Sequence, residues 1–281
     1  MSIKIVTDST SSLSPEIASR FGIEVIPMVV VAGTEQYKDG IEINPPDVFE
    51  YFEKTGELCS TTAINYATYV DIFTPLAAEN DAVIYISLGS GFSVCYQNAV
   101  NASQEFNNVY VIDSENLSSG QGLLVIEAAQ MAAAGATLEE MLEKLSQVAK
   151  RVEASFILNQ LNYMVKGGRC SAVTAMGANL LRIKPSIAVK DGKMGVDKKF
   201  RGKYHKALEE YVIDRLKDRT DIRRDKIFLT YSSADEEAVS IARRCIEQYG
   251  PFDEVFENTS GCTVACHCGP NTLGVLFIRN E

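Results

Sequence analysis

Asp81-Ala82-Val83-Ile84-Tyr85-Ile86 has the length and the apolar, β-branched content of a buried strand. The next residues, Ser87-Leu88-Gly89-Ser90-Gly91-Phe92-Ser93, form a glycine- and serine-rich turn that leads into a helical pattern. A strand that passes through such a turn into a helix is the repeating unit of a parallel α/β sheet. We therefore expect an α/β protein.

The same alternation of strand and helix patterns extends over the first half of the chain. It predicts an N-terminal domain over residues 1–154, with three layers and a parallel sheet covered on both faces. Turn residues predict a small hairpin excursion near 33–46. The strands are expected at 3–7, 24–31, 82–87 and 109–112, and the helices at 15–20, 66–79, 94–105, 120–134 and 138–152.

After about residue 155 the pattern changes to shorter strands and isolated helices, expected at 203–217 and 234–248. This change predicts a second, α+β domain over residues 155–281.

Composition limits the compartment and the class of partner. No apolar run approaches the roughly 18 residues of a membrane span, and the first residues resemble a strand rather than a signal peptide. The seven cysteines are odd in number and scattered, as in proteins with reduced thiols. We expect a cytoplasmic protein.

Charge is unevenly distributed along the chain. The net charge is −10, yet the segment from Lys166 to Lys206 holds eleven basic residues against two acidic ones. An acidic protein is a poor nucleic-acid binder because that affinity depends on phosphate neutralisation. The basic segment is either a solvated face or a docking surface for an acidic partner or a phosphate group.

One histidine of only two, His267, stands in the run Gly261–Val275, which we interpret as a turn before the last apolar strand. It either binds a ligand or satisfies a hydrogen bond of its own loop. Cys262, Cys266 and Cys268 surround it, but their spacing differs from that of zinc knuckles, so we expect no metal.

Two polar clusters, Ser60–Asn65 and Ser87–Ser93, each precede a helical pattern. Free N–H groups at a helix N-terminus favour an anion there, and the hydroxyls of Thr61 and Ser93 could add hydrogen bonds. Plain Ser/Thr capping explains either cluster alone equally well.

Motifs in a fixed order along nearly the whole chain resemble those of the DegV family. In chain order they are Val6-Thr7-Asp8-Ser9-Thr10, Ser60-Thr61-Thr62-Ala63-Ile64-Asn65, Ser90-Gly91-Phe92-Ser93 with Tyr96-Gln97-Asn98-Ala99, Lys166-Gly167-Gly168-Arg169, Ile183-Lys184-Pro185-Ser186, Arg201-Gly202-Lys203 and His267-Cys268-Gly269-Pro270.

The resemblance implies a two-domain protein that encloses one long-chain fatty acid in an apolar tunnel between the domains. It also implies the role of a fatty acid kinase B subunit, which uses no cofactor. Such a subunit presents the acyl carboxylate to a separate ATP-dependent kinase subunit and carries fatty acid or acyl phosphate toward phospholipid synthesis. An acyl-phosphate acyltransferase and transient contact with a membrane surface are the other implied interactions.

Carried over by position, Thr61, Ser93 and His267 match the family residues that bind the carboxylate. Further candidates in the head-group loops are Thr62, Ser90 and Gly91, and Arg169 and Arg201 match arginines associated with kinase docking or the phosphate. The chain departs from the family pattern at Phe92, Val94 and Cys95 and at Ala63-Ile64-Asn65, which affects the shape of the loops but not the Ser93 hydroxyl.

An acyl hydrolase that uses Ser93 as nucleophile and His267 as base is the alternative function. Gly91-Phe92-Ser93-Val94-Cys95 lacks the second glycine of a nucleophile elbow, and no acidic third member is marked. The chain also has no G-x-x-x-x-G-K-[ST] loop, so we expect no kinase activity of its own.

Overall fold

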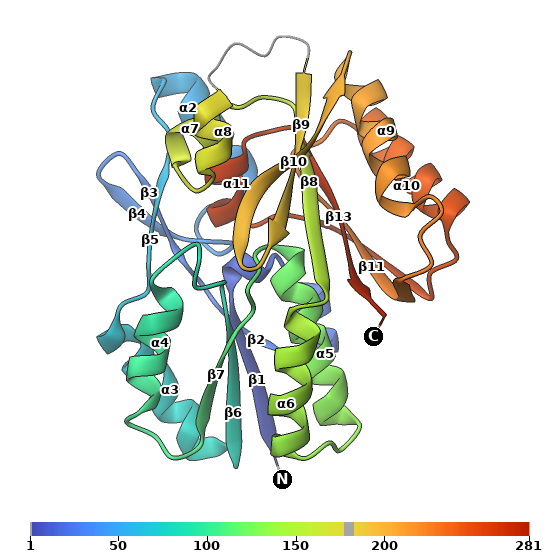
Figure 1. Cartoon of the computed structure of the whole chain (residues 1–281). Coiled ribbons are helices and arrows are strands. Elements are labelled where there is room, and N and C mark those ends of the chain that lie inside the picture. The colour runs from blue at the N-terminus through green and yellow to red at the C-terminus, as the bar shows by residue number, and fades with distance from the viewer. Residues whose placement is uncertain (1, 177–182, 281) are drawn as a thin grey trace.

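The computed structural model describes residues 2–176 and 183–280, apart from the side chain of Met176. Its N-terminal part is a parallel sheet with helices on both faces, and its C-terminal part is a mixed sheet (Figure 1). The predicted α/β fold class is confirmed. The boundary that we place between residues 154 and 155 falls within a strand, β8, and the division into domains stays a prediction.

The first sheet has the strand order β2-β1-β6-β7, with all neighbours parallel. Its strands are β1 (Ile3–Asp8), β2 (Glu24–Ile26), β6 (Ala82–Ser87) and β7 (Val109–Asp113). Helices α3 (Tyr66–Glu79) and α4 (Cys95–Ser103) cover one face, while α5 (Ser119–Ala133) and α6 (Leu138–Ala149) cover the other. A short 3-10 turn, η1 (Ser9–Ser11), and α1 (Pro15–Arg20) follow β1.

The second sheet has the order β10-β9-β8-β13-β11-β12, in which only β11 and β12 pair in parallel. Its strands are β8 (Val152–Leu158), β9 (Ile183–Lys190), β10 (Lys193–Arg201), β11 (Ile222–Ser232), β12 (Glu254–Thr259) and β13 (Thr272–Arg279). Helices α9 (Tyr204–Leu216) and α10 (Glu236–Tyr249) pack on one face. No described helix has the length and apolarity that crossing a membrane requires.

Helix α5 joins the two sheets. Its residues 123–126 are consecutive apolar side chains, and all are fully buried. A helix that is apolar all round must be covered on every side. One side of α5 packs on β1 and β6, and another packs on β8, β11 and β13.

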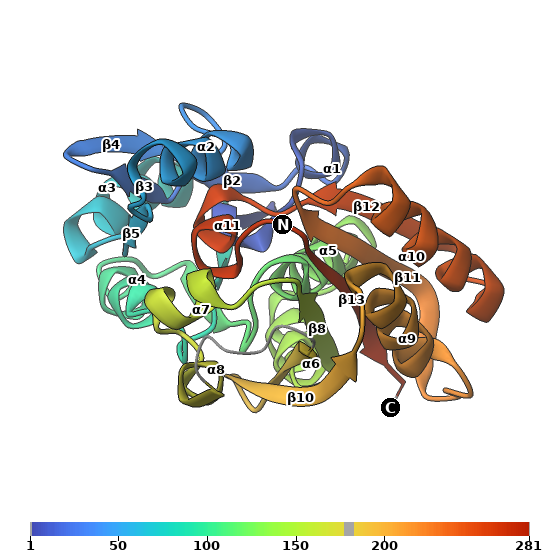
Figure 2. The same cartoon turned by 90° about the horizontal axis from the view of Figure 1, so that it is seen from above.

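A third, small sheet with the order β4-β3-β5 stands beside the first. It consists of β3 (Val29–Ala32), β4 (Glu35–Lys38) and β5 (Ser60–Thr62), and α2 (Pro45–Thr55) lies between β4 and β5 in the chain. Seen from above, this unit lies next to the short helix α11 (Cys262–Cys268) (Figure 2). Two further short helices follow: α7 (Asn162–Gly167) packs on α11, and α8 (Ser171–Met176) packs on α7.

Two sequence-based expectations were wrong in this region, and the hairpin has other bounds than 33–46. The strand expected over 24–31 is two strands, because Pro27 has no N–H for a ladder and the chain changes sheet there. The hairpin has its turn at Gly33 but begins earlier, at β3, and residues 45–46 already belong to α2. The cluster Ser60–Asn65 is not a helix N-terminus throughout, since its first three residues form β5 and Asn65 alone caps α3.

The Asp39 carboxylate fastens α11 to the N-terminal part of the molecule. Asp39 is 3% exposed and accepts hydrogen bonds from the backbone N–H groups of Cys262 (2.8 Å) and Thr263 (3.0 Å). It also accepts from Thr263 Oγ1 (2.8 Å) and Ser9 Oγ (2.9 Å). The N-cap residue of α11 is Gly261, which has no side chain, so Asp39 performs the capping from a distant segment.

We expect Asp39→Ala to lower the free energy of unfolding by about 2 kcal/mol or more, because a cap is lost and buried donors are left unpaired. Asp47→Ala is the matched control: it removes an exposed capping-box carboxylate from α2. Urea denaturation measures both changes. Equal losses in the two variants would contradict a special role for Asp39.

Candidate functional site

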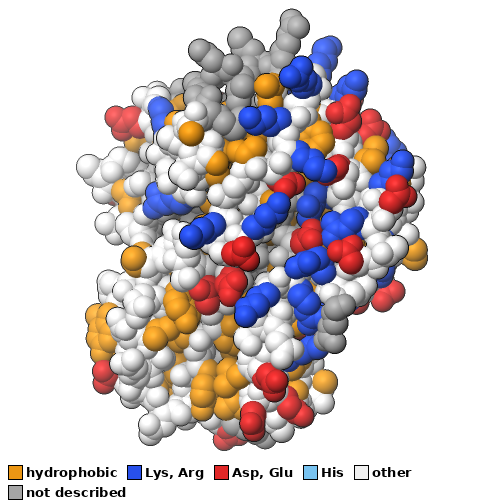
Figure 3. Space-filling view, in the orientation of Figure 1, with side chains coloured by type: hydrophobic (Ala, Val, Ile, Leu, Met, Phe, Trp, Pro, Cys, Tyr) orange, Lys and Arg blue, Asp and Glu red, His pale blue; other side chains and the backbone are white. Residues whose placement is uncertain are grey.

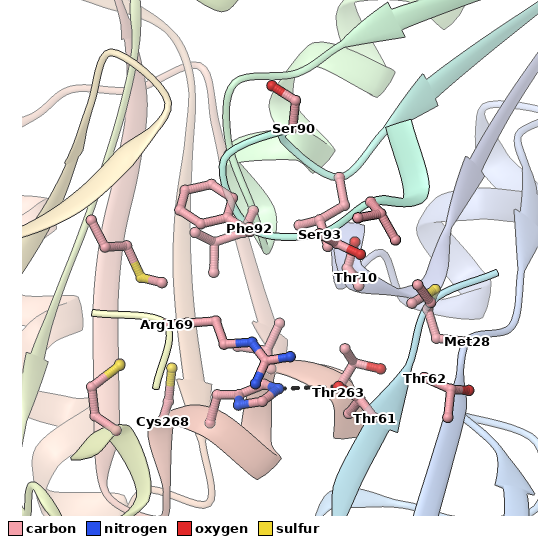
Figure 4. Close-up of a pocket in the computed structure, with 18 residues that line it drawn as sticks. Thr10, Met28, Thr61, Thr62, Ser90, Phe92, Ser93, Arg169, Thr263 and Cys268 are labelled. Carbon is pink, nitrogen blue, oxygen red and sulfur yellow. Dashed lines mark hydrogen bonds between the residues drawn. The ribbon is translucent and has the colours of Figure 1, made fainter. Parts of the chain in front are cut away.

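A cavity of about 480 Å³ lies between the two parts of the molecule. This volume is within the roughly 300–1,000 Å³ typical of small-molecule sites. Figure 4 shows Thr10, Thr61, Ser93 and Arg169 around the same space. The lining residues are polar, namely Thr10, Thr61, Thr62, Ser90, Ser93, Arg169, Thr263 and His267, or apolar, namely Met28, Ala63, Leu88, Phe92, Val94, Leu117, Met164, Met194, Val264 and Cys268.

Thr61 and His267 form a hydrogen-bonded pair on the wall of this cavity. Thr61 lies on β5, opposite Val30 of β3, and its Oγ1 is 3.1 Å from Nε2 of His267. The tautomer of the ring decides which of the two atoms donates. The other ring nitrogen, Nδ1, is buried and has no hydrogen-bond partner among the described residues.

His267 lies in the last turn of α11, so the expectation that it occupies a turn before the final strand was wrong. The helix explains why Thr263 lines the cavity too, because residues four apart share a helix face. Burial, together with the nearby positive charge of Arg169, lowers the pKa of His267 to about 4. The imidazole is therefore neutral at pH 7.

Gly167 places the Arg169 side chain near the histidine through two contacts. A Cβ on Gly167 would lie 2.6 Å from Nδ1 of His267, so only glycine allows the ring to pack against α7. Arg169 Nη1 donates to the Gly167 carbonyl (2.7 Å), and the guanidinium reaches the cavity. Arg169 is exposed, so its charge remains partly hydrated.

Ser93 lines the same cavity but is not bonded to His267. Its Oγ accepts from the backbone N–H of Cys95 (3.2 Å) and donates to Cys95 Sγ (3.1 Å) at the start of α4. The loop before it is held by a buried carboxylate, Asp8, which accepts from the Leu88 N–H (3.1 Å) and the Tyr85 hydroxyl (2.8 Å). The Ser93 hydroxyl is thus at a helix start, as predicted.

The other predicted residues divide between the cavity and the rest of the molecule. Thr62 and Ser90 line the cavity, but Gly91 does not. A Cβ on Gly91 would lie 2.1 Å from the Gly192 carbonyl oxygen, so this glycine allows the loop to pack on the β9–β10 turn. Arg201 is an exposed residue at the end of β10 and is not part of the cavity wall.

The cysteines around His267 point to different neighbours. Cys262 Sγ donates to the Ile43 carbonyl (3.2 Å), whereas Cys266 lies in a buried cluster with Cys59. All seven cysteines are free and buried. No three metal-ligating side chains of the described residues gather in a way that would hold an ion.

A hydrolase site would need a bond from Ser93 to His267 and an acidic residue to orient the ring. In the described part of the chain, the Nε2 atom faces Thr61 instead, and Nδ1 has no partner. The arrangement can bind an anion through hydroxyl, imidazole and guanidinium groups, but it does not activate Ser93.

Sequence reasoning missed Thr10, Thr263 and Met194 as lining residues. Thr10 belongs to the motif Val6-Thr7-Asp8-Ser9-Thr10, for which the sequence indicated no role. The spacing of Thr263 and His267 would have placed both on one face, had the segment been interpreted as a helix.

Known proteins resemble this chain over nearly its whole length. The family model described as "Uncharacterised protein, DegV family" matches residues 2–280. The chain belongs to the DegV family. A DegV domain-containing protein of Clostridium acetobutylicum is 32% identical over 279 residues, which cover 99% of this chain and 98% of the relative.

Solved DegV structures have the same fold. A DegV family protein from Thermus thermophilus, described in terms of fatty acid binding, has a TM-score of 0.90 and 28% identity and covers 99% of this chain and 100% of its own. DegV from Bacillus subtilis, described as a fatty acid binding protein, has a TM-score of 0.85 and 27% identity, with 100% of both chains covered.

The buried histidine of this DegV chain should make stability depend on pH. Between pH 6.5, the ordinary pKa, and about pH 4, the unfolded chain binds a proton at His267 that the folded chain does not. We therefore expect the free energy of unfolding to decrease as the pH is lowered from 6.5 to about 4. The decrease should be smaller in His267→Gln. Urea denaturation at successive pH values measures it, with His205→Gln as control, since His205 is the only other histidine. Identical pH profiles for wild type and His267→Gln would refute the assignment.

Proposed function

We propose that this protein binds one long-chain fatty acid, with the carboxylate at Thr61, Ser93 and His267. The observation that supports it most is the division of one cavity into hydroxyl and nitrogen donors on one hand and apolar side chains on the other. A buried carboxylate needs several charge-assisted hydrogen bonds to offset its desolvation, and these donors supply them. The related proteins of Thermus thermophilus and Bacillus subtilis are described as binding fatty acids.

The acyl chain would continue into a narrow second cavity. This cavity shares Leu117, Val264 and Cys268 with the first, is almost wholly apolar, and measures about 30 Å³. A long acyl chain needs more room, so its walls must move apart on binding. Phe156 and Leu276 line this part, where β8 and β13 face α5.

The bound carboxylate would change the preferred protonation state of His267. Burial and Arg169 keep the ring neutral, but an adjacent anion favours the imidazolium form. Binding would therefore raise the histidine pKa and take up protons. The affinity should weaken as pH rises through the histidine titration of the complex.

We further propose that the protein acts as a carrier subunit in the cytoplasm, without kinase activity of its own. It would present the carboxylate to a separate ATP-dependent fatty acid kinase and carry fatty acid or acyl phosphate to an acyltransferase of phospholipid synthesis. Arg201 supports a docking role, since it is exposed and has no ion pair within the described residues. Seven free cysteines suit a reducing compartment.

The first test is native mass spectrometry of the purified protein, followed by calorimetry with added fatty acid. We expect co-purified fatty acid, and a loss of about 1.5–3 kcal/mol in binding free energy for Ser93→Ala or His267→Ala, the range for a hydrogen bond to a charged group. Ser146→Ala, an exposed site on α6, is the control. Lipid-free protein that does not bind added fatty acid would refute the proposal.

The second test separates docking from lipid binding. Arg201→Glu should slow association with the acidic face of the kinase and make it more sensitive to salt, because exposed charges act mainly on the encounter rate. Fatty-acid affinity should not change. Acyl-phosphate formation with the kinase is the readout, and an unchanged rate at limiting protein would contradict a docking role for Arg201.

A further inference from the structure

Another cleft, of about 700 Å³, is formed by the start of β8, the β9–β10 turn, the end of α9 and the end of β13. It shares no lining residue with the cavity that contains His267, but it borders the narrow second cavity, with which it shares Ala154 and Val189. We name it the arginine cleft after five basic lining residues, which are Lys150, Lys190, Arg215, Arg219 and Arg279. Figure 3 shows Lys and Arg side chains gathered over β9, β10 and α9, with acidic side chains among them.

Ion pairs compensate the basic residues of this cleft only in part: Lys190 is paired with Asp197, but the three arginines outnumber their carboxylate partners by one. Arg215, Arg219 and Arg279 all lie against one carboxylate, Glu153. Arg219 is also held by Asp221, with Nε to Oδ1 at 2.6 Å and Nη2 to Oδ2 at 2.7 Å. Three guanidinium groups thus share two carboxylates.

The surplus is accompanied by buried donors without acceptors. The side chain of Arg215 is 11% exposed, and its Nε has no hydrogen-bond partner in residues 2–176 and 183–280. The Nε of Arg279, on a side chain that is 43% exposed, lies 3.3 Å from a Glu153 oxygen as an ion pair without hydrogen-bond geometry. Buried unpaired donors of this kind are rare in folded proteins and call for a physical reason.

The aromatic ring of Phe277 fixes two of the guanidinium groups. Arg215 lies 5.4 Å and Arg219 lies 5.5 Å from the ring centroid. Stacking of this kind reduces the motion of the side chains and preorganises their N–H groups for a planar or tetrahedral anion.

We propose that the arginine cleft binds a small phosphomonoester that carries hydroxyl groups. Arg215, Arg279 and Lys150 would hold the phosphate, because arginine pairs with phosphate through two parallel hydrogen bonds. Glu115 and Asp191 also line the cleft. Their carboxylates disfavour additional negative charge but accept hydrogen bonds from hydroxyls, so a sugar or polyol phosphate fits better than a polyphosphate.

The test is calorimetric titration of the full chain with glucose 6-phosphate, inorganic phosphate and glucose. We expect glucose 6-phosphate to bind more tightly than inorganic phosphate, and glucose not to bind. Lys150→Gln should weaken glucose 6-phosphate binding about fivefold and Arg215→Gln about tenfold or more, in keeping with charge-assisted bonds. Lys206→Gln is the control, since Lys206 is an exposed lysine on α9 outside the cleft.

Lys150 is exposed, so its variant should fold even if loss of Arg215 disturbs the Glu153 network. Absence of binding by both phosphate compounds at millimolar concentration would overturn the proposal. An equal loss in Lys206→Gln and Lys150→Gln would overturn it too, because it would indicate general charge attraction. Tighter binding of inorganic phosphate than of glucose 6-phosphate would refute the class of ligand.

Discussion

The site depends on the Asp39 carboxylate, which accepts three hydrogen bonds from the start of α11 and a fourth from Ser9. Without this cap, a helix of seven residues would leave its first N–H groups unsatisfied inside the protein. Ser9 extends the connection, because its Oγ accepts from the Met28 N–H (3.0 Å) while it donates to Asp39. One carboxylate thus connects η1, the segment after β4 of the small sheet and the helix that carries His267.

Close packing between α7 and α11 also holds His267 in position. Gly167 lets α7 approach the ring of His267, and Gly269 lets the end of α11 approach Tyr163, whose ring would lie 2.6 Å from an added Cβ. Because neither contact tolerates a side chain, the two helices hold each other in one arrangement. The Gly-Gly-Arg motif therefore has a packing function as well as an electrostatic one: the glycine places the histidine, and Arg169 acts on its charge.

Local signals predicted much of the fold but little of the site geometry. Helices 15–20 and 66–79 were predicted with the bounds that the structure has, since a cap such as Ser14 or Asn65 is adjacent in sequence. Helix α11 was missed because its cap, Asp39, lies 223 residues from Cys262. The pairing of Thr61 with His267, 206 residues apart, is likewise a product of tertiary structure. Residue identity indicated the chemistry, whereas only the fold could bring the groups together.

The placement of charge suits a buried site that binds an anion reversibly, as proposed. A permanently cationic group at the position of His267 would be buried without an acidic partner among the described residues, and burial of an unpaired charge is costly. A neutral imidazole avoids that cost, and the permanent positive charge is left to Arg169, which water still reaches. In the proposed complex, the carboxylate would provide the negative charge that makes protonation of the ring favourable. The ion pair would then form only with the bound anion.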